Sequence, residues 1–308
     1  WVKGYGDPFL VSEELTIIAG TVATKLQERG ISRLGEIRLD TTYFAGNINL
    51  PGTASSNNPY DAYPGALAAN FNTIFARRKN GDIVSAEEQT PITASARLIY
   101  NSMKGQSERI NTGPDNKIAE RYFAELLAEF LRRKDIEVED EISWGEIPSS
   151  LPLAYRHLNS RPLASVIKPM MEYSTNFIAN QLALKLGAEY HGAPASSDKV
   201  TQTFNEQLTT EFGWELFFLE DGAGLSRANK ISPAQLVDVL GRFRNWKHLL
   251  PEIGPGIYAK SGSLIGISAL AGYIKKQDEY RPFAVIINQK TPYRFRNKLA
   301  VELSKQTD

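Results

Sequence analysis

Two short stretches of this sequence hold side chains that could carry out chemistry together. Lys260-Ser261-Gly262 opens one arm of a predicted β-hairpin, although these three residue types stabilise a strand poorly. Ser174-Thr175-Asn176 interrupts a predicted helical stretch far upstream. A serine that attacks an amide needs a base, oxyanion donors and groups that hold the acyl donor. One solution without histidine combines S-x-x-K, S-x-N and K-[ST]-G sequences, so the two stretches point to serine-dependent acyl transfer.

Each stretch also has an ordinary structural explanation, and both explanations stay open at this point. A lysine on an exposed edge strand discourages pairing with other sheets, which is one use for Lys260. An asparagine at a helix break often caps the next turn, which is one use for Asn176. Both triplets are short enough to arise by chance, so neither identifies a site by itself.

The composition argues against several classes of protein. The 308 residues are enough for about two domains, and 35 basic residues balance 35 acidic ones. A neutral chain without a dense basic stripe is not expected to bind nucleic acid. No apolar run reaches the roughly 18 residues that span a bilayer, so we expect no transmembrane segment and at most peripheral contact with a membrane.

Metal and cofactor sites are not expected either. The chain has no cysteine, which excludes disulfides and thiolate ligands. Its histidines, His157, His191 and His248, are far apart and lack the spacing of metal ligands. We therefore expect the chain to work without a metal ion or a cofactor.

The first half of the chain mixes helices with short strands. A helix is predicted over residues 12–30, with Ser12 as its N-cap and Gly30 in the left-handed position after its end. Its apolar face consists of Leu15, Ile18, Ala19, Val22 and Leu26. Short strands and a turn-rich segment at residues 47–63 follow, and a second amphipathic helix is predicted over residues 117–133.

A second region begins near Ser149. It opens with a long helical stretch that is interrupted at residues 173–176 and resumes to Gly187. Further on, Ser232-Pro233 is a helix start signal. The remaining predicted elements are a glycine-bearing loop at 221–227, a helix to Leu240, the hairpin at 259–274, a buried strand at 282–288 and a closing helix at 294–305.

The glycine-bearing loop carries the most specific pattern. Asp221-Gly-Ala-Gly-Leu-Ser-Arg227, followed by Asn229, resembles the D-G-S-G-L-S-R-x-N signature of one penicillin-binding-protein family. That family contains the D-alanyl-D-alanine carboxypeptidases and endopeptidases with a large domain inserted in the transpeptidase fold. The similarity extends along nearly the whole chain. Further matches are Gly6-Asp7-Pro8 with Leu10, Asp40 with Phe44, Ser160-Arg-Pro-Leu163, and Ala-Leu-Ala-Gly-Tyr273 after the Lys-Ser-Gly triplet.

The resemblance implies a fold class and a division of the chain. The expected class is α/β (α+β), with an antiparallel sheet flanked by helices as in penicillin-binding proteins and serine β-lactamases. Residues 1–148 would form the inserted accessory α/β domain. Residues 149–308 would form the C-terminal part of the transpeptidase-like domain, whose N-terminal part lies outside these residues.

The resemblance also implies catalytic roles. Ser174 would pass a proton between a lysine base and the leaving amine, and Asn176 would hydrogen-bond the backbone of the substrate. Lys260 would hold positive charge beside the substrate carboxylate. Ala223 stands where the family usually has serine, and we expect this difference to matter little.

Three residues of the strand would bind substrate. Ser261 would donate to the terminal carboxylate of D-alanine, and the backbone N–H of Ser263 would be one of two oxyanion donors. Gly262, without a β-carbon, would let the substrate and the helix with the nucleophile approach the strand. The peptide would then lie antiparallel along this edge, as in β-augmentation.

Two further residues match positions that bind meso-diaminopimelate in relatives. Asp40 would take the side-chain ammonium and Arg227 the carboxylate, a pairing that is chemically sensible. The alternative is that Asp40 only ends a strand and Arg227 makes a structural salt bridge.

The largest departure from the family is the absence of a credible S-x-x-K nucleophile. Two sequences match the pattern, Ser165-Val-Ile-Lys168 and Ser196-Ser-Asp-Lys199, but neither has the family's position before Gly6. We expect the nucleophile to precede Trp1 in the complete protein, together with a signal peptide, or to come from a separate chain.

Two functions follow from the resemblance. The first is a penicillin-sensitive, serine-type D-Ala-D-Ala carboxypeptidase or endopeptidase that acts on peptidoglycan stem peptides in the periplasm. Its expected partners are meso-diaminopimelate-type stem peptides that end in D-Ala-D-Ala, and β-lactams. The second is a catalytically inactive relative that binds cell-wall peptide or a partner through the same groove.

Overall fold

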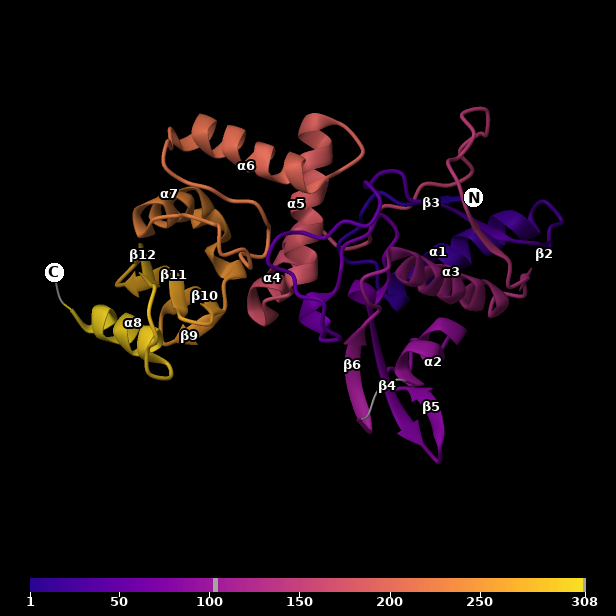
Figure 1. Cartoon of the computed structure of the whole chain (residues 1–308), viewed down its shortest axis with the longest axis horizontal. Coiled ribbons are helices and arrows are strands. Elements are labelled where there is room, and N and C mark those ends of the chain that lie inside the picture. Colours follow the sequence, from indigo (N-terminus) through magenta and orange to yellow (C-terminus); the bar gives the residue numbers. More distant parts are fainter. Residues whose placement is uncertain (102–104, 307–308) are drawn as a thin grey trace.

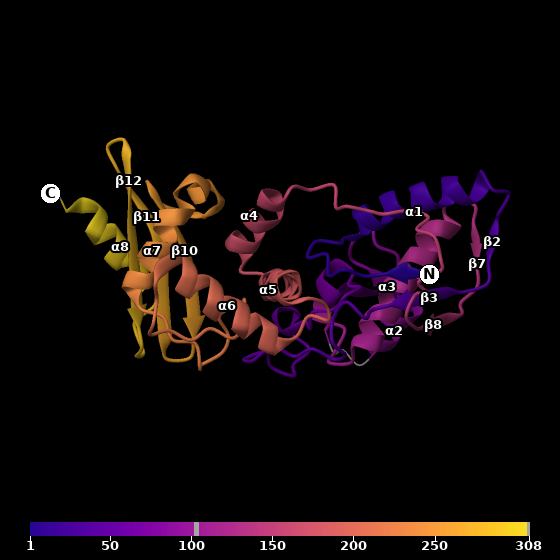
Figure 2. The same ribbon diagram turned by 90° about the horizontal axis from the view of Figure 1, so that it is seen from above.

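The computed structural model describes residues 1–101 and 105–306, and the described chain is elongated (Figure 1). Helices α1 to α3 and several short sheets form one end, and the N-terminus lies there. Helices α4 to α6 occupy the middle. A four-stranded sheet with α7 and α8 forms the other end, and Figure 2 shows the same three parts from above.

The N-terminal end is built from short, separate sheets around two long helices. One sheet is parallel, in the order β1-β3-β8, a second pairs β2 with β7, and a third is antiparallel, in the order β5-β4-β6. The helices are α1 (Ser12–Gln27), α2 (Ala94–Asn101) and α3 (Asn116–Arg132). The strands are β1 (Val2–Lys3), β2 (Arg33–Leu34), β3 (Ile37–Asp40), β4 (Thr73–Lys79), β5 (Asp82–Ser85), β6 (Ser107–Asn111), β7 (Glu137–Val138) and β8 (Ile142–Trp144).

The core of this end lies between α1 and α3. Leu15 and Ala19 are fully buried, and the rest of the predicted apolar face of α1 packs against the same cluster. Gly30 has the predicted left-handed conformation, with φ +70°. The prediction that Ser12 caps α1 is wrong, because the helix already includes Ser12 and its backbone N–H donates to Asn70 Oδ1 at 2.9 Å. A side chain 58 residues away therefore satisfies this donor.

The middle part consists of α4 (Leu163–Tyr173), α5 (Asn176–His191) and α6 (Ser197–Phe212). The predicted break between the first two helices is present, whereas α6 was not predicted. Two apolar clusters join this part to earlier segments. One contains Phe44 and Leu184, and the other contains Ala68 and Phe177. The division at residues 148/149 stays a prediction, and both clusters include residues from its two sides.

The C-terminal end is an antiparallel sheet in the order β12-β11-β10-β9. The predicted hairpin is confirmed, with Ser261 opposite Leu270. Ser232 caps α7 as predicted, since its Oγ accepts from Gln235 N–H in a capping box. The elements are α7 (Pro233–Phe243), the 3-10 helix η3 (Arg244–Leu249), β9 (Glu252–Gly254), β10 (Ile257–Leu264), β11 (Ile267–Lys276), β12 (Glu279–Ile287) and α8 (Phe295–Lys305).

The two faces of this sheet pack against different helices. On one face, Ala259 and Leu270 form a cluster with Ala300 of α8. On the other, Tyr273 packs with Leu240 of α7, and its hydroxyl donates to the Leu240 carbonyl oxygen at 2.5 Å. Alternate residues of β10 therefore face α8 or the helices α4 and α7.

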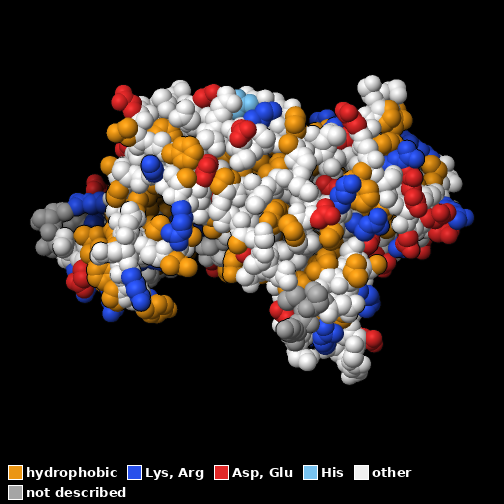
Figure 3. Space-filling view, in the orientation of Figure 1, with side chains coloured by type: hydrophobic (Ala, Val, Ile, Leu, Met, Phe, Trp, Pro, Cys, Tyr) orange, Lys and Arg blue, Asp and Glu red, His pale blue; other side chains and the backbone are white. Residues whose placement is uncertain are grey.

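Positive and negative side chains lie interspersed on the face shown in Figure 3. None of the helices in the described part of the chain combines the length and hydrophobicity that crossing a bilayer requires. Across residues 1–101 and 105–306, no three acidic or histidine side chains come together in a way that could hold a metal ion.

Candidate active site

Lys260 is the central side chain of the candidate site. Ala259 packs on the α8 side of the sheet, so the alternation of the strand turns Lys260 toward α4 and α5. There its Nζ donates to Ser174 Oγ and, at 2.9 Å, to the carbonyl oxygen of Ser261. Burial lowers the pKa of Lys260, and the positive charge of Arg296 lowers this pKa further.

Ser174 lies at the junction of two helices. It follows the last residue of α4 in the left-handed conformation, with φ 55° and ψ 51°. A residue with a β-carbon adopts this conformation at a cost of roughly 1–2 kcal/mol. Its backbone N–H donates to the Met170 carbonyl oxygen, which closes the end of α4. The turn leaves Ser174 exposed, and its hydroxyl meets Lys260.

Asn176 begins α5, close to Ser174. Its side chain does not cap the helix, because the N-cap is Thr175 and no side-chain cap is formed there. Instead, Asn176 Nδ2 donates to the backbone carbonyl oxygen of Tyr60 at 2.9 Å. Tyr60 belongs to the 3-10 helix η1 (Pro59–Asp61), so an N-terminal segment fixes the amide of Asn176. Among the described residues, none donates a hydrogen bond to its Oδ1, which leaves this oxygen for a ligand.

The outer edge of β10 is open along the motif. β9 pairs only with Ile257 and Tyr258, and the N–H of Ala259 points to this same side, where it donates to Pro251 O at 3.0 Å. In an antiparallel ladder, residues two apart direct their N–H groups to the same side. The N–H groups of Ser261 and Ser263 therefore face the open edge.

Gly262 is less constrained than the sequence suggested. A β-carbon at this position would meet only Ala269 Cβ, at 3.6 Å, which is ordinary contact. The expected close approach to Gly262 is thus not imposed by any residue that the structure describes. A steric requirement for glycine is found instead on the neighbouring strand, where a β-carbon at Gly272 would lie 2.0 Å from Tyr258 O.

The glycine-bearing loop is folded around Asp221. Its buried carboxylate accepts from the N–H groups of Leu225 and Ser226 and from Asn229 Nδ2, at 2.8, 3.2 and 2.6 Å. A β-carbon at Gly222 would lie 2.4 Å from the Ala179 carbonyl oxygen of α5. Asp221 and Gly222 position the loop against α5, a role that the sequence motif alone does not indicate.

Arg227 emerges from this loop and is exposed. Its Nη2 donates to the carbonyl oxygen of Ile265 at 3.0 Å. Ile265 lies at the tip of the β10–β11 hairpin, so Arg227 ties the loop to the strand that carries Lys260. In the described residues it makes no salt bridge.

A family of known proteins matches the part of the chain that holds most of this site. The profile of the D-Ala-D-Ala carboxypeptidase 3 (S13) family matches residues 106–252, which include Ser174, Asn176 and the loop around Asp221. The match covers slightly less than half of the chain, so it is a similarity to this family over residues 106–252.

Two curated proteins similar to the chain are named D-alanyl-D-alanine carboxypeptidases. The chain is 30% identical over 179 residues to the D-alanyl-D-alanine carboxypeptidase DacB of Haemophilus influenzae, covering 50% of this chain and 37% of the relative. It is 24% identical over 213 residues to a D-alanyl-D-alanine carboxypeptidase of an Actinomadura species, covering 58% and 39%. The chain thus spans well under half the length of these relatives.

Several solved structures are similar to the chain in fold. Penicillin binding protein 4 of Haemophilus influenzae has a TM-score of 0.75 at 22% identity, with 98% of this chain and 81% of that chain covered. A complex of the same protein with a β-lactam has a TM-score of 0.68 at 22% identity, with the same coverage. A predatory endopeptidase of Bdellovibrio bacteriovorus, solved with an immunity protein, reaches 0.51 at 15% identity, covering 98% and 75%. The chain has the expected penicillin-binding fold, a mixed α/β structure with an antiparallel sheet flanked by helices.

Asp40, which the sequence predicts to bind a ligand ammonium, is held by partners within the chain. Its side chain is fully buried, and it accepts from Lys3 Nζ, Ile147 N–H and Thr42, at 3.0, 3.0 and 2.6 Å. Burial alone would raise the pKa of Asp40, but hydrogen bonds from Ile147, Thr42 and Lys3 outweigh it and lower the pKa to about 2. Lys3 already supplies an ammonium to this carboxylate, and the binding of a ligand ammonium by Asp40 stays a prediction.

The two S-x-x-K sequences of the chain lie apart from this site. Ser196 caps α6 by accepting from Lys199 N–H, and Lys199 Nζ donates to the carbonyl oxygens of Gly192 and Pro194. Ser165 and Lys168 are exposed on α4. In the described part of the chain, no contact joins either pair to Ser174 or Lys260.

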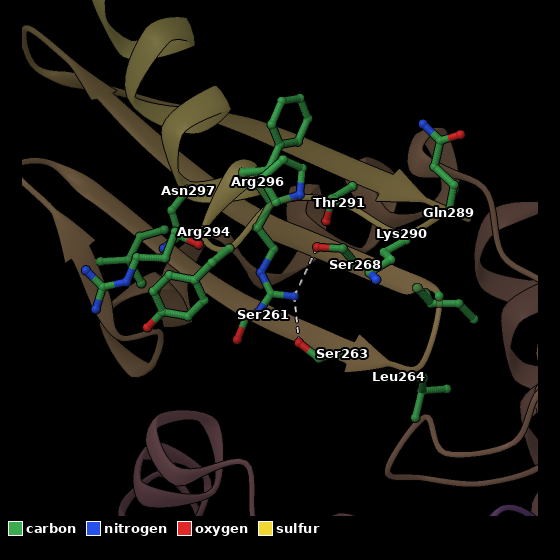
Figure 4. Close-up of a pocket in the computed structure, with 16 residues that line it drawn as sticks. Ser261, Ser263, Leu264, Ser268, Gln289, Lys290, Thr291, Arg294, Arg296 and Asn297 are labelled. Atoms are coloured by element: carbon green, nitrogen blue, oxygen red, sulfur yellow. Dashed lines mark hydrogen bonds between the residues drawn. The ribbon is translucent and has the colours of Figure 1, made fainter.

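Arg296 is a residue beside the β10 motif that the sequence did not predict (Figure 4). It lies in the first turn of α8, yet its Nη1 donates to Gly262 O at 2.5 Å and to Ser263 Oγ at 2.7 Å. The sequence around it is an ordinary basic stretch at a helix start, so no local pattern links it to the β10 motif.

Proposed function

We propose that the chain is part of a serine-type D-alanyl-D-alanine carboxypeptidase or endopeptidase that acts on peptidoglycan stem peptides through an acyl-enzyme. The observation that carries the proposal is the hydrogen bond from Lys260 Nζ to Ser174 Oγ beside the open edge of β10. The match of residues 106–252 to the S13 family model supports the choice of reaction.

Lys260 and Ser174 would act together in proton transfer. An ammonium that donates to Ser174 Oγ turns the serine O–H away from itself and toward the groove. The hydroxyl can then relay a proton from the base beside the nucleophile to the leaving amine. The positive charge of Lys260 would also attract the carboxylate of the peptide substrate.

The open edge of β10 would bind the peptide as an additional strand. Main-chain hydrogen bonds along residues 261–263 would fix the register of the peptide, and Asn176 Oδ1 would accept from its backbone. The N–H of Ser263 faces the same edge and would donate to the oxyanion, a contact whose loss typically raises a barrier by about 3 kcal/mol.

The nucleophilic serine and its lysine would come from an S-x-x-K segment outside these 308 residues. The proposed location is the bacterial periplasm, and β-lactams would acylate the same serine. The β-lactam complex of the Haemophilus influenzae protein supports this choice of inhibitor. A catalytically inactive relative that binds cell-wall peptide reversibly is the second candidate, because neither S-x-x-K sequence in the chain contacts the site.

Labelled penicillin distinguishes the two candidates in the full-length protein. Intact-mass measurement and N-terminal sequencing first establish which residues are present. A covalent adduct that Lys260→Ala abolishes supports the enzyme, with Lys168→Ala as a matched control that leaves acylation unchanged. Reversible peptide binding without any adduct supports the inactive relative. An adduct of undiminished yield in Lys260→Ala would refute the assignment of this strand.

A further inference from the structure

A segment that forms neither helix nor strand leads from the N-terminal end of the molecule to α4 (Figure 2). Along residues 155–160 the side chains alternate between partly buried and exposed, starting with the partly buried Tyr155. Such alternation is typical of an extended backbone with one side against the protein. Pro162 is the N-cap of α4, and Ser174 lies at the other end of this helix. The segment therefore connects the N-terminal end to the candidate active site.

Glu14 of α1 holds this segment through three hydrogen bonds. Glu14 is 2% exposed, and its carboxylate accepts from Ser160 N–H, Ser160 Oγ and His157 Nε2, at 2.6, 2.7 and 2.7 Å. The other ring nitrogen of His157 lies 3.0 Å from the Tyr155 hydroxyl, which can donate to it. Burial alone would raise the pKa of Glu14, but the hydrogen bonds from Ser160 and His157 outweigh it and lower the pKa. The segment thus surrounds a buried, charged carboxylate with donors.

A second carboxylate, that of Asp7, holds the same segment. Asn159 Nδ2 donates to both carboxylate oxygens of Asp7 at 3.1 Å and to the Phe9 carbonyl oxygen at 3.0 Å. Asp7 and Asn159 are 152 positions apart in the sequence. The contacts of Asp7 and Glu14 bring together two stretches that resemble the penicillin-binding-protein family, Gly6-Asp7-Pro8 and Ser160-Arg-Pro-Leu163.

Helix α4 depends on its ends for its position. Of its 11 residues only Val166 is buried, so packing along its length is weak. The contacts of Ser160 fix the chain two residues before the Pro162 N-cap. A helix of 11 residues is about 16 Å long, so a rotation of about 10° at its start moves its end by about 3 Å. Such a displacement would break the hydrogen bond between Ser174 and Lys260.

We propose that Glu14 is a positioning residue for the candidate active site. By holding residues 157–160, Glu14 fixes the start of α4 and with it the place of Ser174 opposite Lys260. Asp7 contributes a second attachment. The N-terminal end of the molecule thus sets the geometry of the site without contacting the substrate. The inference rests on the proposed function, to which it adds a residue from a distant helix.

The test measures the acylation rate of the full-length protein with labelled penicillin. Glu14→Ala removes the acceptor of all three hydrogen bonds and should slow acylation about ten- to hundredfold, because small misplacements of a reacting group have effects of this size. Glu14→Gln should stay within about threefold of wild type, since its amide oxygen can accept from His157 and from Ser160 N–H. The Ser160 hydroxyl can in turn accept from the new amide N–H. This comparison separates the hydrogen bonds of Glu14 from its charge.

Leu15→Ala is the matched control for stability. Leu15 follows Glu14 on α1, but it is fully buried in the core between α1 and α3. This variant should lower the midpoint of urea unfolding and leave the acylation rate unchanged under conditions in which it is folded. Equal slowing by Leu15→Ala and Glu14→Ala would show that Glu14 acts only through stability. The proposal also fails if Glu14→Ala acylates like wild type, or if Glu14→Gln is as slow as Glu14→Ala.

Hydrogen exchange provides a measurement that needs no nucleophile. In the 308-residue chain, Glu14→Ala should accelerate amide exchange in residues 163–175 at least about tenfold, whereas Leu15→Ala should accelerate it mainly in α1 and α3. Unchanged exchange of residues 163–175 in Glu14→Ala would overturn the proposal. A wild-type protein that forms no penicillin adduct would refute the proposed function instead, and the exchange measurement would still decide this inference.

Discussion

Lys260 of β10 and Ser174, between α4 and α5, are joined by a hydrogen bond across 86 positions of sequence. The contact is formed at the one residue between these two helices that has a left-handed backbone. It links the four-stranded sheet to the helical middle of the molecule. The geometry of the candidate site therefore depends on how both parts are held together.

The strained backbone of Ser174 leads to the first prediction. Ser174→Gly removes the β-carbon that disfavours φ 55°, so the free energy of unfolding should rise by about 0.5–1 kcal/mol. Loss of the hydroxyl should at the same time slow acylation of the full-length protein at least about a hundredfold. Urea denaturation and labelled penicillin measure the two effects. A variant that loses stability, or that acylates at the wild-type rate, would contradict this account of Ser174.

The carboxylate of Asp40 should make the free energy of unfolding depend on pH under acidic conditions. Its pKa is lowered to about 2 in the fold from an ordinary 3.8, so its contribution is complete above pH 4 and is lost as the pH falls toward 2. Asp40→Asn should lower the free energy of unfolding by about 2–3 kcal/mol at pH 6, since Lys3 and Ile147 N–H lose a charged acceptor. The difference from wild type should shrink between pH 4 and pH 2.

Urea denaturation at each pH measures this difference. Asp278→Asn, in the exposed turn between β11 and β12, is the control and should match wild type at every pH. A difference for Asp40→Asn that stays constant from pH 6 to pH 2 would show that the lowered pKa has no role in stability.

Alanine substitutions at two glycines test close packing and helix propensity separately. At Gly222 a new β-carbon would lie 2.4 Å from Ala179 O and 2.8 Å from Ala183 Cβ, so Gly222→Ala should destabilise by about 1–3 kcal/mol. At Gly241, inside α7, nothing lies within 4 Å of the new atom, so Gly241→Ala should stabilise by about 0.5–1 kcal/mol. Thermal or urea unfolding measures both. Equal effects of the two substitutions would rule out the close approach of the loop to α5.

Elements with local signals were predictable from the sequence. The apolar face of α1, the capping box at Ser232 and the β10–β11 hairpin all depend on residues close together in the chain. By contrast, α6 is rich in threonine and polar residues and has only Val200 and Thr203 buried, so its periodicity is weak. The two-residue strands β2 and β7 pair across about a hundred residues, and no local pattern reports such pairing.

The site was predictable only in part, for a related reason. Lys260 and Ser174 were predicted to lie close together because the S-x-N and K-[ST]-G sequences follow one another in the order of the penicillin-binding-protein motifs. The number of residues between them gave no such information. The burial of Asp40 depends on Lys3 and Ile147, which approach it from opposite sides in sequence. Arg296 reaches β10 from the last helix. Residues defined by such long-range contacts carry no signal in their own neighbourhood.

The most direct measurement of the central claim is a double-mutant cycle on the acylation rate of the full-length protein with labelled penicillin. If Lys260 and Ser174 act as one proton-handling unit, Lys260→Ala and Ser174→Ala should each slow acylation about 10²- to 10³-fold, and the double variant should be no more than about threefold slower than the worse single variant. Slowing factors that multiply in the double variant, or a Lys260→Ala protein that acylates as fast as wild type, would contradict the account.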